Sequence, residues 1–150
     1  MLRETSLGYG RLLFHLGVVM SIARTIVRIL LGVAWVFFGL NGFFHFFTPP
    51  PMTGDAGTFF TGMMASGYIF PVISAVEIIA GLMFLANRFV ALGLVLLAPI
   101  LINILAFHLM LDLKGIGMGA LFTLMALFLA WCERGAYAGI LSPTAPARTA

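Results

Sequence analysis

Charged residues are scarce in this chain of 150 residues. Only 9% of the residues are Asp, Glu, Lys or Arg, whereas a soluble domain carries about 25%. Hydrophobic residues make up 62% of the chain, and the mean hydropathy is +1.13. A soluble protein with this composition would have too few polar residues to cover its surface. We therefore expect a protein that contacts the lipid bilayer along most of its length.

Cysteine is scarcer still, because Cys132 is the only one in the chain. A disulfide within the chain, or a relay of two thiols, needs a second cysteine. The sequence therefore excludes a self-contained dithiol oxidoreductase. The chain is basic, with a pI near 9.6, but its arginines are scattered and form no basic face or nucleic-acid-binding motif. We expect no nucleic-acid partner.

Long apolar runs are what the sequence has in place of charge. Four of them approach the roughly 20 residues that a helix needs to cross a bilayer: Ile29–Phe47, Tyr68–Ala86, Phe89–Leu111 and Ile116–Cys132. In lipid, such runs must be helices, because a helix satisfies its own backbone polar groups. Only short turns join the second run to the third and the third to the fourth. The sequence predicts an all-α fold, an antiparallel bundle of four transmembrane helices.

The basic residues predict the orientation of this bundle. All but one lie before the first run, in the turn between the second and third, or after the fourth: Arg3, Arg11, Arg24, Arg28, Arg88, Arg134 and Arg148. Only Lys114 lies in the turn between the third and fourth runs, on the opposite side of the membrane. Because positive charge is retained on the cytoplasmic side, we expect both termini in the cytoplasm.

The regions before and after the bundle are predicted to lie outside the bilayer. Residues 1–27 are interpreted as a cytoplasmic or interfacial segment, residues 28–134 as the transmembrane domain, and residues 135–150 as a cytoplasmic tail. A second interpretation of the N-terminal region places the true start of the protein at Met20. It rests on "MSIARTIVRILLG", which is by itself a complete cytoplasmic lead-in to the first helix.

The only long connection runs from Thr48 to Gly67. Its first part, "TPPPMTGDAG", contains three prolines that remove backbone donors and prevent regular structure. After it, Asp55 is expected to cap a short helix that Gly67 ends. Apolar side chains on adjacent turns of this helix predict that it lies on the outer membrane surface. The alternative is that it forms a lid over the bundle.

Small residues and polar residues are both placed unusually within the runs. Gly32, Gly39 and Gly42 in the first run and Gly81 in the second are expected to let two helix backbones approach closely.

The polar residues predict a ladder, a series of polar side chains at increasing heights through the outer half of the bundle. It runs from Glu77 at a height of about 14 Å to His108 at about 28 Å above the cytoplasmic helix ends. The rungs between them are Asn41, Asn103 and His45.

Glu77 is the most informative member of this ladder. A carboxyl group near the middle of a membrane is costly, so we expect it to face the bundle interior, to be hydrogen-bonded and often to be protonated. Two interpretations of Glu77 stay open. It either moves a proton or orients a ligand, or it ties helices together through Asn41 and Asn103.

The histidines carry a weaker prediction. His45 is the second candidate for proton transfer, although an imidazole near the interface can also simply reach water or headgroups. His108 is expected at the rim of the ladder, on the same helix face as Asp112. No metal site is predicted, because the helical rise separates the two histidines and Glu77 by up to about 14 Å.

The sequence at this point resembles a known family. The segments "RILLGVAWVFFGLNGFFHFFTPPP" and "SGYIFPVISAVEIIAGLMFLANRFVALGLVLLAPILINILAFHLML", followed by a short fourth helix, resemble the DoxX-like family of small four-helix membrane proteins. The resemblance covers Arg28 to Arg134 and includes all five polar rungs. It implies a location in the prokaryotic cytoplasmic membrane. The family takes its name from the small subunit of an archaeal complex that oxidises thiosulfate and passes electrons to quinone.

Two hypotheses about function follow. In the first, the outer half of the bundle binds a quinone or a similar amphiphile, and a protein partner supplies the electrons. Glu77 and His45 are then the proton-transferring residues, and the ligand-binding residues are Asn41, Asn103, His108, Phe38 and Phe107. In the second, the protein is a non-enzymatic membrane adaptor or assembly factor that holds a partner or a second copy of itself, and the ladder is structural. A transporter is disfavoured because no polar path crosses the cytoplasmic half.

Overall fold

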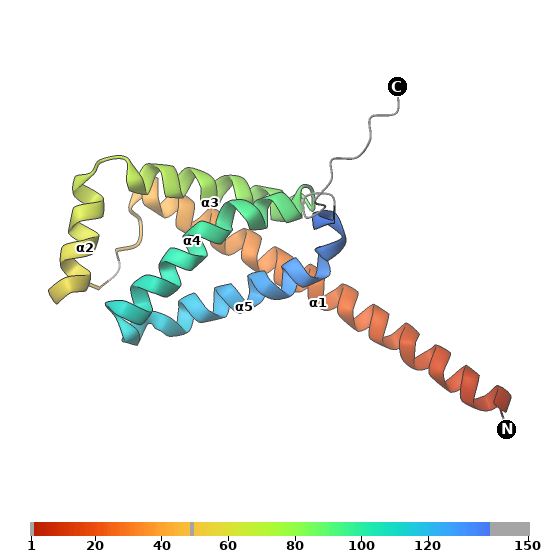
Figure 1. Ribbon diagram of the computed structural model, residues 1–150. Helices are drawn as coiled ribbons and strands as arrows, with labels where there is room; N and C mark the ends of the chain where they lie inside the picture. Colours follow the sequence, from red (N-terminus) through yellow and green to blue (C-terminus); the bar gives the residue numbers. More distant parts are fainter. Residues whose placement is uncertain (1, 49, 139–150) are drawn as a thin grey trace.

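The computed structural model describes residues 2–48 and 50–138, with side chains from Leu13 onward, and this part of the chain is helical throughout apart from turns and one loop (Figure 1). Five α-helices and two short 3₁₀ helices follow one another: α1 (Leu2–Phe44), α2 (Gly54–Ala65), α3 (Ile69–Leu85), α4 (Val90–Met110), η1 (Leu113–Gly115), α5 (Ile116–Cys132) and η2 (Arg134–Tyr137). The predicted all-α fold class is confirmed.

Three stretches are long and apolar enough to cross a membrane: Leu13–Phe44, Val90–Met110 and Leu113–Cys132. Helix α3 has 17 residues, which is the lower end of the usual length for a span. Helices α2 and α3 qualify as a fourth span only if they are counted as one segment, although α3 is bent by 86° relative to α2. The protein is therefore a membrane protein with three helices that qualify as spans, or four if this bent pair is one.

Helices α1, α3, α4 and α5 enclose a common interior. Helix α1 packs against α3 and α5, and α4 packs against the same two helices. Buried apolar side chains from all four helices form one core: Leu31, Trp35, Ala80, Phe84, Val90, Leu94, Leu97, Leu101, Ala126 and Leu129. The predicted helical hairpins are present, because the turns at "NR" and "DLKG" bring consecutive helices together.

The contact between α1 and α3 is the most extensive in the molecule. A Cβ atom added at Gly39 would lie 2.7 Å from the backbone oxygen of Ser74, and one added at Gly81 would lie 2.9 Å from the backbone oxygen of Gly32. Both distances are shorter than a Cβ atom tolerates, so only glycine lets the two backbones come this close. The expectation from the small residues is confirmed.

Helix α1 differs from its predicted bounds. It runs without interruption from Leu2 to Phe44, whereas the sequence predicted a separate segment before Ile29. Figure 1 shows its N-terminal half projecting away from the other helices. The side chains from Leu13 to Met20 are all exposed. No glycine pair or proline interrupts this stretch, so the helix continues past the arginines that were expected to mark its start.

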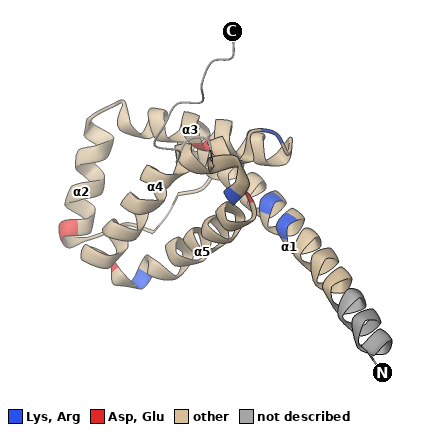
Figure 2. Ribbon diagram, turned by 45° about the vertical axis from the view of Figure 1, so that its right-hand side comes forward, with Lys and Arg blue, Asp and Glu red and all other residues tan. Residues whose placement is uncertain are grey.

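The charges separate the two ends of the bundle. Arg28 contacts the end of α3, Arg24 pairs with Glu133 after α5, and Arg88 lies in the turn between α3 and α4. We call this end of the bundle the arginine end. Lys114 lies in η1, between α4 and α5, at the opposite end. Figure 2 shows basic residues on α1 and, well apart from them, at the far end of α5. The acidic Asp55, at the start of α2, also lies away from the arginine end.

Helix α2 is the short helix that was expected in the long connection, and Figure 1 shows it running across the end of the bundle opposite the arginine end. Its N-cap residue is Thr53 and not the predicted Asp55, which lies in the first turn. Gly67 follows the helix with a positive φ of 72° and ends it as predicted. The ring of Phe59 packs 5.6 Å from that of Phe107 in α4.

The tail predicted over residues 135–150 begins with η2, and residues 139–150 lie outside the described part of the chain.

Candidate functional site

Glu77 lies on the face of α3 that points into the bundle. The buried residues of α3 are Ser74, Glu77, Ala80, Gly81 and Phe84, which recur at helical spacing and so form one face. Only 8% of the surface of Glu77 is exposed. No hydrogen bond or ion pair to its carboxyl group occurs within the described residues. The structure therefore confirms the predicted inward position and does not provide the partners expected for this group.

A second buried polar group without a partner is the indole N–H of Trp35 in α1. Trp35 is 2% exposed, and its Nε1 has no hydrogen-bond partner among the described residues. The next residue, Val36, faces Gly81, which lies about one turn from Glu77. Trp35 on α1 and Glu77 on α3 thus lie at similar heights on two helices that pack against each other.

Aromatic rings surround the Trp35 side of this interior. The ring of Trp35 lies 5.6 Å from that of Phe122 in α5, and the ring of Phe38 lies 5.8 Å from the same Phe122. Phe38 is half-buried against this aromatic cluster, whereas the half-buried Phe107 contacts Phe59 of α2 at the end of the bundle.

Asn41 uses its side chain at the end of its own helix. Its Oδ1 accepts a hydrogen bond of 2.7 Å from the backbone N–H of Phe47. His45 begins the loop with a positive φ of 52°, and its backbone N–H donates to the oxygen of Asn41 over 2.8 Å. This geometry is a helix C-terminus closed by a left-handed residue. It explains why α1 ends at Phe44 and not at the predicted Phe47, and it leaves the His45 side chain exposed.

Asn103 and His108 also bond within their own part of the chain. The Nδ2 of Asn103 donates to the backbone oxygen of Pro99 over 2.9 Å, and Asn103 is exposed on α4. The Nδ1 of His108 lies 3.1 Å from the backbone oxygen of Asp112 and 3.5 Å from its carboxylate. His108 and Asp112 therefore lie on the same side, as their spacing of four residues predicted. No described hydrogen bond links either residue to Glu77, so the five rungs do not form a connected ladder.

The side chains that could bind a metal ion are dispersed over the part of the chain that the structure describes. Within residues 2–48 and 50–138, no three His, Cys, Asp or Glu side chains lie close enough together to hold a metal ion. Of the predicted site residues, only Glu77 is buried, and Asn41, Phe38, Phe107 and His108 are half-buried.

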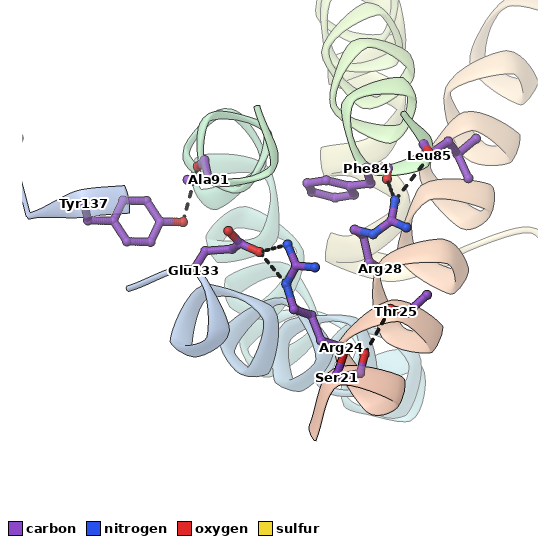
Figure 3. A network of polar contacts seen from close by, with 9 residues as sticks. All are labelled: Ser21, Arg24, Thr25, Arg28, Phe84, Leu85, Ala91, Glu133 and Tyr137. Atoms are coloured by element: carbon purple, nitrogen blue, oxygen red, sulfur yellow. Dashed lines mark hydrogen bonds and ion pairs between the residues drawn. The ribbon is translucent and has the colours of Figure 1, made fainter. Parts of the chain in front are cut away.

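Sequence reasoning missed two residues of importance. The sequence could have indicated Trp35 as unusual, because tryptophan in a membrane helix usually lies at the interface and this one lies well inside its apolar run. Arg28 was assigned only to topology. In the structure it is buried and its guanidinium donates to the backbone oxygens of Phe84 and, over 3.3 Å, of Leu85 (Figure 3).

No family model, curated protein or solved structure matches this chain.

Proposed function

We propose that this chain is a DoxX-like protein of a prokaryotic cytoplasmic membrane, with four transmembrane helices and the arginine end in the cytoplasm. In this proposal it binds a quinone or a similar amphiphile and serves as an accessory subunit of a membrane oxidoreductase. The observation that carries the proposal is that Glu77 and the indole N–H of Trp35 are buried and find no hydrogen-bond partner within residues 2–48 and 50–138.

The donor set of this interior fits a quinone. A quinone has two carbonyl oxygens that accept hydrogen bonds, and the indole N–H of Trp35 is a donor that has no acceptor among the described residues. A protonated Glu77 is a second donor. In this proposal the flat ring packs against the aromatic cluster of Trp35, Phe38 and Phe122. A bound quinone would supply two-electron, two-proton redox chemistry, with the electrons coming from a protein partner.

Within this proposal the two residues have different roles. Trp35 can only hold and orient a carbonyl oxygen, because an indole does not titrate in the physiological range. Glu77 can both orient the ligand and exchange a proton with it. Asn41, Asn103 and His45, which bond locally or lie exposed, are not required.

Fluorescence of Trp35 tests this proposal directly. The chain has two tryptophans, and replacing the exposed Trp131 by Phe leaves Trp35 as the only reporter. Titration with a soluble quinone analogue should quench it saturably. Glu77→Leu should weaken binding by about tenfold, the loss of one hydrogen bond to a group that can carry charge. Glu77→Gln, which keeps a donor, should bind more nearly like the parent.

The control for this experiment is Asn103→Leu, which changes an outward-facing amide and should leave the quench unchanged. The proposal fails if no saturable quench occurs under conditions where a known quinone-binding protein responds. It also fails if Glu77→Leu binds as well as the parent.

A second candidate function is that of a membrane adaptor, and one observation favours it. Phe14 and its neighbours in α1 are exposed and apolar beyond the bundle, in a stretch of 32 residues that is longer than one span needs. In this second proposal a partner helix packs against them. Full-length protein and protein starting at Met20 can be compared for quinone binding and for mass in detergent. A change of mass with unaltered quinone binding favours the adaptor.

A further inference from the structure

A hollow of about 430 Å³ opens at the arginine end of the bundle. Its walls come from the start of α4, from the end of α5 with η2, and from one arginine of α1. The side chains that decide its chemistry are Arg24, Phe89, Leu92, Val95, Glu133 and Tyr137. None of these residues takes part in the Glu77 interior, so this is a separate site.

An ion pair forms one side of the hollow. The Nε of Arg24 donates to Oε1 of Glu133 over 2.7 Å, and a second guanidinium nitrogen contacts the same oxygen (Figure 3). The side chains of Arg24 and Glu133 are 31% and 17% exposed. Because one carboxylate oxygen takes both contacts, the other oxygen and the third guanidinium nitrogen have no partner among the described residues. The pair can therefore receive an anion and a cation at the same time.

Tyr137 holds the remaining side of the hollow in place. Its hydroxyl donates to the backbone oxygen of Ala91 over 3.3 Å, which ties η2 to the first turn of α4 (Figure 3). Burial and then the carboxylate of Glu133 raise the pKa of Tyr137. The phenol consequently stays neutral and remains a donor at physiological pH.

The hollow lies at the end of a candidate membrane span, where lipid headgroups would be expected. Helix α4 begins at Val90 and forms a candidate membrane span from that residue. Leu92 and Val95, which line the hollow, are exposed on the outer face of the same helix. The site therefore has charged groups at the membrane boundary and an apolar path that continues into the bilayer. Phe89, with a strained positive φ of 57°, places its exposed ring at this boundary.

We propose that this hollow binds the headgroup of a zwitterionic phospholipid that carries a primary ammonium. Arg24 binds the phosphate, Glu133 binds the ammonium, and the acyl chains follow Leu92 and Val95 along α4. An anionic phospholipid without an amine would satisfy Arg24 but leave the carboxylate of Glu133 facing negative charge. The charge pair thus predicts a preference for phosphatidylethanolamine over phosphatidylglycerol.

The test uses full-length protein equilibrated in vesicles of equal parts phosphatidylethanolamine and phosphatidylglycerol. Lipids retained after gentle solubilisation are identified by native mass spectrometry. Wild-type protein should retain phosphatidylethanolamine in an excess of about tenfold, as expected for a charge-assisted hydrogen bond. Glu133→Gln should lose this preference. Arg134→Gln removes a nearby exposed charge outside the hollow and should keep it.

A second variant keeps the experiment decisive if Glu133→Gln does not fold. Ala136 is exposed and lines the hollow, so Ala136→Trp fills the space without removing either charge. It should abolish the retained lipid. Equal retention of the two phospholipids by wild-type protein overturns the proposal, as does unchanged retention in Ala136→Trp. Quinone binding is followed in Ala136→Phe, which also fills the hollow but adds no tryptophan to the fluorescence of Trp35. It should be unchanged, so the two proposals fail independently.

Discussion

The guanidinium of Arg28 closes the C-terminal end of α3 by donating to the backbone oxygen of Phe84. The last carbonyl groups of a helix have no partner within it and carry the negative end of the helix dipole. The oxygen of Phe84 also accepts from the backbone N–H of Asn87 over 3.1 Å, and the buried arginine from α1 adds a second donor and a positive charge at this point. It fixes the height of α1 against α3, which are the two helices that carry Trp35 and Glu77.

Replacing Arg28 by Met should therefore destabilise the protein by about 1.5–3 kcal/mol, the range for hydrogen bonds that involve a charged group. Arg28→Lys should recover part of this loss because it keeps a cation at the helix end. The measurement is unfolding by SDS in mixed micelles, followed by circular dichroism. Arg88→Met, which removes an exposed arginine of the adjoining turn, is the control and should change stability by no more than about 0.5 kcal/mol. Equal effects of Arg28→Met and Arg88→Met would contradict the capping role.

The tight contact between α1 and α3 gives a second prediction. Gly39→Ala should cost about 1–3 kcal/mol, as other overpacked substitutions do, because its Cβ would lie 2.7 Å from the backbone oxygen of Ser74. Gly17 is the matched control on the same helix, since nothing lies within 4 Å of a Cβ added there. Gly17→Ala should be neutral or stabilise the helix by up to about 1 kcal/mol.

Gly42 allows a test of the same contact by rescue. A Cβ at Gly42 would collide with the Oγ of Ser74, a side-chain atom that can be removed. Gly42→Ala should be destabilising alone, and Ser74→Ala should restore part of the stability in the double variant. Additive effects of the two substitutions would show that α1 and α3 do not meet at this position.

Much of the fold could be predicted from the sequence, because lipid leaves few alternatives. A long apolar run must be a helix, and a two-residue turn must return the chain antiparallel. The structure confirms α5 at its predicted bounds and α3 and α4 to within one residue at each end. Glycine spacing likewise identified the closest helix pair.

The candidate site was less predictable, because depth along a helix does not determine the direction of a side chain. Asn41 and Asn103 were placed at suitable heights, but each satisfies its amide with the backbone of its own segment. Such local bonds compete with interhelical ones for Asn. The continuity of α1 was missed for a related reason. Arginines usually mark a membrane boundary, but here both have partners distant in sequence: Arg24 pairs with the carboxylate of Glu133, and Arg28 donates to a backbone oxygen of α3.

Burial of an unpartnered carboxyl group leads to a third prediction. Leaving a polar group buried without a hydrogen bond costs about 1–3 kcal/mol in proteins, so Glu77→Leu should stabilise the fold by an amount of this order. SDS unfolding can measure the change, and Ser74→Ala on the same face serves as the control. A stabilised variant that also loses quinone binding would indicate a residue kept for function. A destabilised Glu77→Leu would instead mean that this carboxyl group is hydrogen-bonded in the membrane.

The end of α1 distinguishes a local role of Asn41 from a role in the interior. If its side chain accepts from the backbone N–H of Phe47, Asn41→Ala should increase the hydrogen-exchange rate of that amide by about fivefold, the loss of one ordinary hydrogen bond. Asn103→Ala, which removes the corresponding amide from α4, should leave exchange at Phe47 unchanged. Neither substitution should alter the quenching of Trp35 by quinone. If Asn41→Ala weakened quinone binding and left exchange at Phe47 unaltered, its amide would point into the interior. The quinone site would then have to be assigned to the polar ladder inferred from the sequence, and not to Glu77 and Trp35 alone.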